Sequence, residues 1–248
     1  MRAPLLVSGF AALALLFSAI ISPVDAGSIP VTECGMRFSG YGYLVHDLDC
    51  SGYTYGVEMD GGTLSLSGFT IVAGAKYGVL CHRSCKVVNG TIRDAGEDGI
   101  VAIKNLKVVN LTSRDNGFTG VKAGAAVLAE RSVFEGNVRS GVQGLRRAKL
   151  KDVVSRNNGY GAGGSDSTTV IDSEVVGNAE GGIGSDRIAI TRSTIRDNHS
   201  GAACGVTATC ADLESPYRAP KLKESTCETS HRGGTVINGE TWGVCSLD

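Results

Sequence analysis

The most regular feature of the chain is a short pattern that returns about every 21 residues. Each unit opens with glycine and a small apolar residue, and then runs through short segments in which apolar and polar residues alternate. This period-two alternation predicts half-buried strands, and the Gly, Asn and Asp residues between the segments predict turns. The opening glycines are Gly56, Gly78, Gly99, Gly120, Gly141, Gly161, Gly182 and Gly201.

A second column of residues keeps the same period and consists of Asn116, Asn137, Asn158, Asn178 and Asn198. About 21 residues are too few for two helices and a turn, but they fit three short strands joined by corners. The repeat therefore predicts about eight three-stranded coils that stack by strand pairing at about 4.8 Å per coil. A leucine-rich repeat is the alternative solenoid, but leucine is scarce here and glycine follows several of the asparagines.

The register of the repeat predicts which side chains face the interior. The apolar residues after the repeat glycines are expected to point inward, namely Val79, Ile100, Val121, Val142 and Ile183. Two places further along, a column of mostly small residues is expected to line the narrow inside of the coil: Met59, Cys81, Ala102, Ala123, Gly144, Gly164, Ser185 and Cys204. The asparagines are expected at a corner, in left-handed backbone, with their amides hydrogen-bonded from coil to coil. The alternative is a row of ligand-binding amides.

These Gly-Val/Ile elements, together with sequences such as Arg114-Asp115-Asn116 and Arg196-Asp197-Asn198, resemble those of right-handed parallel β-helix proteins of the pectin-lyase-like superfamily, particularly its small exported bacterial members. The resemblance covers residues 52–204 and implies an all-β, right-handed parallel β-helix. It leaves the activity open, because that superfamily includes pectate lyases, polygalacturonases, uronate epimerases and non-catalytic surface proteins.

Both ends of the chain depart from the repeat. Residues 1–26 combine Arg2, an apolar stretch and the small-residue site Val24-Asp25-Ala26, which predicts a cleaved secretory signal peptide, with an uncleaved anchor as the alternative. Residues 27–51 and 205–248 are expected to cap the stack, because open strand edges would otherwise pair with other chains. The protein is therefore predicted to be secreted, periplasmic or on the cell surface, as a monomer without a membrane span.

An even number of cysteines in an exported chain predicts disulfide bonds. The simplest pairing is sequential: Cys34 with Cys50, Cys81 with Cys85, Cys204 with Cys210, and Cys227 with Cys245. Two alternatives remain at this point. Cys204 could pair with Cys227 or Cys245, and the Cys81 to Cys85 segment could bind a metal.

The charge balance excludes one broad class of function. The chain has 24 Lys and Arg against 25 Asp and Glu, a net charge of -1. A general nucleic-acid binder normally carries a marked basic excess, so nucleic acid is not an expected partner.

The first coils concentrate acidic and basic residues at positions predicted to face outward: Glu58, Asp60, His82 and Arg83. Uronate lyases of the resembling superfamily use acidic clusters that bind calcium and a basic residue that removes a proton beside a carboxylate. The four residues are therefore candidate catalytic residues, although the Asn-Thr-Asp and Gly-His-Gly motifs of polygalacturonases are absent. The alternative is a solvated scatter of charge.

Two aspartates, Asp166 and Asp186, are candidate calcium ligands. The segment Gly181 to Ile188 matches a calcium-binding nonapeptide, and residues 163–166 partly repeat it one coil earlier. A further outward column, Arg93, Arg114, Glu135, Arg156, Val176 and Arg196, could grip the carboxylates of an acidic polysaccharide or simply keep the surface soluble.

The sequence thus predicts an exported β-helix that binds glycans or acts as a surface or periplasmic scaffold without catalysis. A polysaccharide lyase or uronate epimerase is the alternative.

Overall fold

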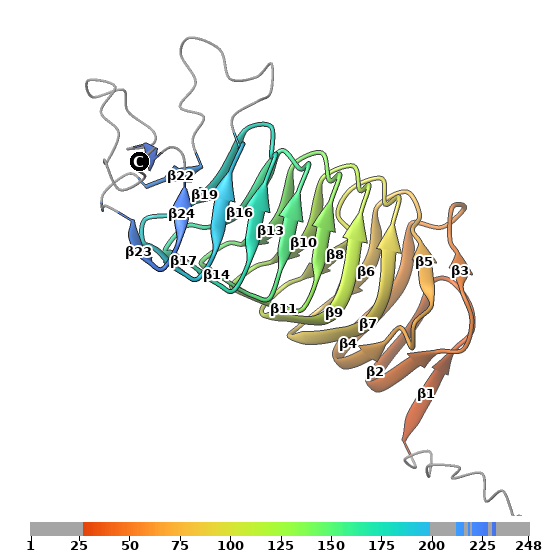
Figure 1. Cartoon of the computed structure of the whole chain (residues 1–248). Helices are drawn as coiled ribbons and strands as arrows, with labels where there is room; N and C mark the ends of the chain where they lie inside the picture. Colours follow the sequence, from red (N-terminus) through yellow and green to blue (C-terminus); the bar gives the residue numbers. More distant parts are fainter. Residues whose placement is uncertain (1–26, 199–211, 216–217, 219, 228–229, 232–248) are drawn as a thin grey trace, which may run out of the picture.

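The computed structural model describes residues 27–198, 212–215, 218, 220–227 and 230–231, and all regular structure in these ranges is β-strand. The chain winds through three parallel columns of strands, which we call the first, second and third sheets (Figure 1). The predicted all-β parallel solenoid of about eight coils, with about 21 residues in each, is confirmed.

The strands of each sheet come from successive coils and pair with the strand one coil away. The first sheet contains β2 (Met36–Leu44), β4 (Tyr55–Ser65), β6 (Tyr77–Cys81), β8 (Ile100–Ala102), β10 (Thr119–Ala123), β13 (Ser140–Gly144), β16 (Tyr160–Gly164), β19 (Gly181–Gly184), β22 (Leu213–Glu214) and β25 (Ser230–His231). The second sheet contains β1 (Ser28–Val31), β7 (Cys85–Arg93), β9 (Leu106–Arg114), β11 (Ala126–Glu130), β14 (Arg147–Lys151), β17 (Ser167–Ile171), β20 (Ile188–Thr191) and β23 (Lys221–Lys223). The third sheet contains β3 (Leu48–Asp49), β5 (Thr70–Val72), β12 (Val133–Glu135), β15 (Val154–Arg156), β18 (Glu174–Val176), β21 (Thr194–Arg196) and β24 (Thr226–Cys227). The longest strands, β2, β4, β7 and β9, turn a corner and continue into the next sheet.

The core follows the predicted register. Val79, Ile100, Val121 and Val142 pair in one column and are fully buried, and Ile183 is 1% exposed. The small inward column is also confirmed where it is described, while Cys204 lies outside the described residues. Gly144 shows why this column must be small, because a β-carbon there would lie 2.0 Å from the Arg147 carbonyl oxygen.

The asparagine column forms the predicted ladder. Each Nδ2 donates to the Oδ1 of the next asparagine, from Asn116 to Asn198, at 2.6–3.0 Å, and the last one donates to Asp212 at 2.8 Å. The expected left-handed backbone is one residue out of place, because the positive φ angles occur just before the ladder, as at Asp115 (56°) and Asn157 (55°). The turn is made by the preceding residue, which leaves the asparagine side chain free to point inward and stack.

The N-terminal segment expected to be a cap adds strands to the stack, because β1 pairs with β2 and β2 pairs with β4. Two predicted disulfides are confirmed. Cys34 is bonded to Cys50, and Cys81 is bonded to Cys85 at the corner between β6 and β7. Cys227 is also disulfide-bonded, whereas Cys204, Cys210 and Cys245 lie outside the described residues, as does the predicted signal peptide. Disulfides fit a non-cytoplasmic location.

The described part of the chain contains no helix long and apolar enough to cross a membrane.

Candidate functional site

The four candidate catalytic residues lie together in the second and third coils, on the outer surface of the first sheet and at the corner where its strands end. Glu58 and Asp60 belong to β4, and His82 and Arg83 follow β6 directly. The Oε2 atom of Glu58 is 2.9 Å from Nε2 of His82, and both side chains are less than one third exposed. A carboxylate at this distance orients the imidazole ring, and an oriented imidazole is one of the groups that can act as a general acid or base.

Asp60 is held by a residue that the sequence analysis did not single out. Nε of Arg37 lies 3.2 Å from both carboxylate oxygens of Asp60. This hydrogen bonding holds the pKa of Asp60 below its usual value, with smaller contributions from the nearby charges of His82 and Arg83. Asp60 therefore stays ionised and engaged with a cation, which reduces its capacity to act as a base. The repeat could have predicted the position of Arg37, because Arg37 is equivalent to Glu58 and pairs with it one coil later.

The two candidate calcium ligands also lie together. Asp166 and Asp186 line a cavity of about 330 Å³ that they share with Arg187 and Arg218. The Asp166 carboxylate accepts hydrogen bonds from Arg146 Nε at 3.1 Å and from Ser165 Oγ at 3.0 Å, and these bonds lower its pKa. Calcium takes six to eight oxygen ligands, whereas this cavity is completed by guanidinium groups. Within the described residues, no group of three or more His, Cys, Asp and Glu side chains is placed to hold a metal ion.

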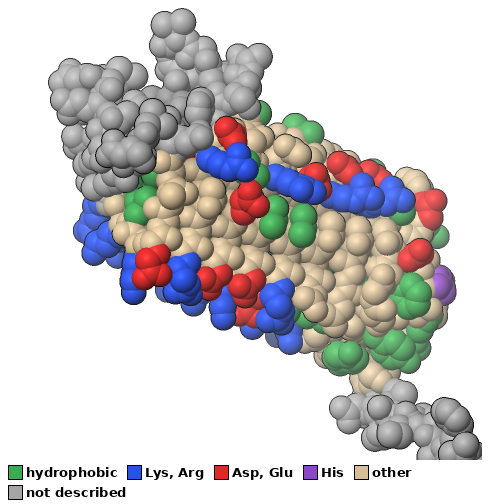
Figure 2. Space-filling model, viewed as in Figure 1, with side chains coloured by type: hydrophobic (Ala, Val, Ile, Leu, Met, Phe, Trp, Pro, Cys, Tyr) green, Lys and Arg blue, Asp and Glu red, His purple; other side chains and the backbone are tan. Residues whose placement is uncertain are grey.

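The arginine column of the third sheet is occupied by ion pairs within the chain. Arg114 contacts Asp115 at 2.5 Å, Arg156 contacts Glu135 at 3.0 Å, and Arg196 contacts Asp197 at 2.5 Å. Arg93 is paired with Asp94 in the same way. Figure 2 shows charged side chains of both signs gathered in stripes along the length of the stack, with a band of few charges between them. The column therefore has the structure expected of a solvated surface.

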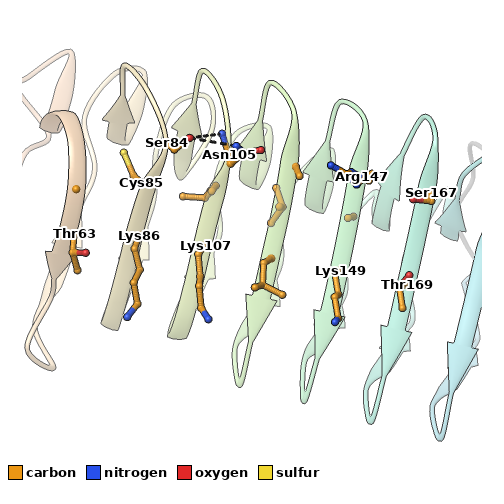
Figure 3. A pocket seen from close by; sticks show the side chains of 16 residues that line it. Thr63, Ser84, Cys85, Lys86, Asn105, Lys107, Arg147, Lys149, Ser167 and Thr169 are labelled. Carbon is orange, nitrogen blue, oxygen red and sulfur yellow. Dashed lines mark hydrogen bonds between the residues drawn. The ribbon is translucent and has the colours of Figure 1, made fainter.

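A different surface has an excess of positive charge. The outer side of the second sheet carries a groove of about 780 Å³ that runs across the successive strands β4, β7, β9, β11, β14 and β17 (Figure 3). Along it, Lys86, Lys107 and Lys149 extend from the strands in one column, because β7 pairs with β9, β9 with β11, and β11 with β14 in register. Arg147 adds a fourth cation, and no acidic residue is among the described residues that line the groove.

The charges of this basic groove are only partly neutralised. Nζ of Lys107 lies 3.0 Å from Oε2 of Glu130, at the edge of the groove, and this contact lowers the pKa of Glu130. Lys86, Arg147 and Lys149 are exposed and form no ion pair with any part of the chain that the structure describes. Three cations therefore face solvent together on a protein whose net charge is only -1.

Polar and apolar groups complete the lining. Ser84, Asn105, Ser167 and Thr169 provide hydroxyl and amide groups, and Leu128 provides an apolar surface between Lys107 and Lys149. This groove was not predicted, because the outward columns that stand out in the sequence lie on the other two sheets only. The repeat does contain a sign of it, since Lys86, Lys107 and Lys149 are separated by one and then two repeats of 21 residues.

Comparison with known proteins identifies no family for the chain. Searches of protein-family models, curated proteins and solved structures found no match. The function has to be argued from the geometry of the sites, because one fold supports many activities.

Proposed function

We propose that the protein is an exported β-solenoid that binds an acidic polysaccharide, without catalysis, along the basic groove of the second sheet. The observation that carries the proposal is a set of three cations, Lys86, Arg147 and Lys149, that form no ion pair with described residues, in a groove where no described lining residue is acidic. Clefts lined by charge of one sign attract ligands of the opposite sign, and this attraction falls as the salt concentration rises.

The spacing of the cations suits a polymer better than a small anion. Adjacent coils are about 4.8 Å apart, so Lys86 and Lys107 are separated by about one strand spacing, and Lys149 lies about two spacings beyond Lys107. An extended polyanion that lies parallel to the stack axis would meet these cations in succession. The hydroxyl groups of Ser167 and Thr169 are placed to bond sugar hydroxyls beside them.

We expect the protein to bind pectate or alginate, and the Lys86→Glu/Lys149→Glu double variant to bind at least about tenfold more weakly, which corresponds to about 1.4 kcal/mol. The reversed charges would repel the carboxylates that the two lysines attract. Affinity is measured by titration calorimetry at low and at physiological salt, with neutral dextran as a second ligand.

The control is Lys76→Glu/Lys104→Glu, which makes the same change in net charge at exposed positions outside the groove. We expect it to retain most of the affinity. Equal losses in both double variants, or equal binding of dextran and pectate, would show that the groove is not the binding site.

A second candidate function is uronate elimination at the Glu58–His82 pair, which the 2.9 Å contact favours. In this reaction a base removes the proton on the carbon beside the sugar carboxylate and the glycosidic C–O bond breaks. A C=C double bond forms in one product, and the leaving oxygen takes up a proton.

If this candidate is right, ultraviolet absorbance from unsaturated uronides will accumulate when the protein is mixed with pectate or alginate and calcium. We would then expect Arg83→Ala and His82→Ala to abolish the signal, while Lys149→Glu would mainly raise the KM. Sustained turnover of this kind would replace the non-catalytic proposal, and the absence of product would remove the candidate.

A further inference from the structure

A small hollow lies on the outer surface of the first sheet, on a different face from the basic groove. It has a volume of about 300 Å³ and spans three neighbouring strands, β13, β16 and β19 (Figure 1). Small-molecule sites in proteins occupy about 300 to 1,000 Å³, so this hollow has room for one ring rather than a polymer. Its lining includes Arg139, Gln143, Leu145, Tyr160, Gly163 and Gly184.

The floor of the hollow is made of two glycines at outward-facing positions. Gln143, Gly163 and Gly184 follow one another in register, so the column that carries long side chains earlier in the stack is empty here. A β-carbon at Gly184 would meet no atom of the described residues within 4 Å, and its φ is not in the left-handed region. Neither the backbone conformation nor packing against the described residues requires glycine at this position. Glycine inside a strand weakens the strand, and it often marks a place where a ligand approaches the backbone closely.

The side of the hollow contains an unsatisfied hydrogen-bond acceptor. The Oε1 atom of Gln143 is buried and accepts no hydrogen bond from any described group. A buried oxygen without a donor is unfavourable, and native proteins usually supply a partner. The side-chain amide of Gln143, which lines the hollow, has two donor hydrogens and one acceptor oxygen, so the group can form a hydrogen bond with a hydroxyl group there.

The rest of the wall combines an aromatic ring with apolar surface. Tyr160 is partly buried, and Leu145 is 51% exposed although it is a large apolar residue. Burial raises the pKa of the Tyr160 phenol, and the charges of Glu214 and Glu180 add to this effect, so the phenol is a neutral hydrogen-bond donor. The hollow thus has one cation in its lining, Arg139, and two acidic residues, Glu180 and Glu214, near the Tyr160 ring. The basic groove, in contrast, has an excess of positive charge.

From this arrangement we infer that the hollow is a binding site for a single uncharged pyranose ring. The apolar face of the ring lies against Tyr160 and Leu145, a ring hydroxyl donates to Gln143, and the ring edge rests on the backbone at Gly163 and Gly184. The hollow and the basic groove are independent sites. They lie on different sheets, they share no lining residue, and the ligand of the hollow is uncharged whereas that of the groove is acidic.

The test uses the methyl glycosides of glucose, galactose, mannose and glucuronic acid as probes in saturation-transfer-difference NMR. We expect ring protons of at least one neutral glycoside to receive magnetisation from the protein. The variant Gly184→Val adds side-chain atoms to the floor of the hollow, at a position where a β-carbon meets no described atom within 4 Å, and is expected to weaken that binding at least tenfold. Gln143→Leu keeps the volume of the side chain, removes the acceptor, and is expected to weaken binding as well.

The matched control is Gly52→Val, because Gly52 also has open space around its α-carbon and lies outside the hollow. It is expected to bind like the original protein, and thermal unfolding checks that all variants are folded. No signal from any neutral glycoside, an unchanged signal in Gly184→Val, or equally strong binding of the glucuronide would overturn the inference. Pectate binding by Gly184→Val is expected to stay unchanged, so failure here is distinguishable from failure of the proposed groove.

Discussion

Replacing Ile100 by aspartate is expected to prevent the protein from folding. Ile100 is fully buried in β8, with Val79 on one side and Val121 on the other in the same register. A carboxylate at this position would have neither water nor a cation beside it, and the lost apolar packing alone costs about 2 to 5 kcal/mol. The total is comparable with the whole stability of a typical domain, about 5 to 15 kcal/mol. Soluble yield and far-ultraviolet circular dichroism measure the outcome.

The matched control is Ile103→Asp, the same replacement three residues further along at a position that is 56% exposed. It is expected to be folded and to differ from the original protein by about 0.5 kcal/mol or less. Ile100→Val provides a variant that folds, with an expected loss of about 0.5 to 1.5 kcal/mol in urea unfolding. A soluble Ile100→Asp protein with native-like dichroism would contradict the register of the stack.

The second large effect is expected at the centre of the asparagine ladder. Oδ1 of Asn137 accepts from Nδ2 of Asn116 at 2.7 Å, and its Nδ2 donates to Oδ1 of Asn158 at 2.8 Å. The Asn137 side chain also accepts from the backbone N–H of Asn116 at 3.3 Å and donates to the Ser113 carbonyl oxygen at 3.2 Å. Asn137→Gly removes all four bonds, although the side-chain amide of Asn116 keeps Ser113 as a partner. Each buried group left unsatisfied costs about 1 to 3 kcal/mol. We expect a total loss of about 2 to 4 kcal/mol, measured from the midpoint of urea unfolding.

Asn157→Gly is the control because it is the same replacement beside the ladder. Asn157 has a φ of 55°, and glycine already occupies the equivalent corner at Gly136 and Gly177, with φ of 65° and 64°. The variant is expected to stay within about 0.5 kcal/mol of the original, since glycine adopts this backbone without strain. Equal midpoint shifts in both variants would show that the ladder bonds do not contribute as described.

The candidate sites differ in how far the repeat could predict them. Glu58 and His82 were identified because the first coils concentrate acidic and basic residues at outward positions, and the structure brings the two side chains into contact. The pairing of Asp60 with Arg37 was missed because the column of repeat glycines was followed only from Gly56 onward, although Gly35 and Met36 continue the repeat one coil earlier. Whether each charged side chain is neutralised depends on which side chains it contacts, and the aligned repeats of the sequence do not specify those contacts.

The number and grouping of the cysteines predicted two of the disulfides. The periodicity alone was sufficient to predict the stacked coils, the inward column from Val79 to Ile183 and the amide ladder. These features depend on local alternation and on a fixed repeat length, so each coil constrains the next. The basic groove and the Gly184 hollow depended instead on which of the three sheets each outward residue faces, and on whether a nearby carboxylate neutralises it. Arg156 and Arg147 show the difference. Both are outward arginines, but among the described residues only Arg156 of the two has a carboxylate, that of Glu135, with which it forms an ion pair. Arg156 and Glu135 are 21 residues apart in the chain, and the folded coils bring them to the same surface.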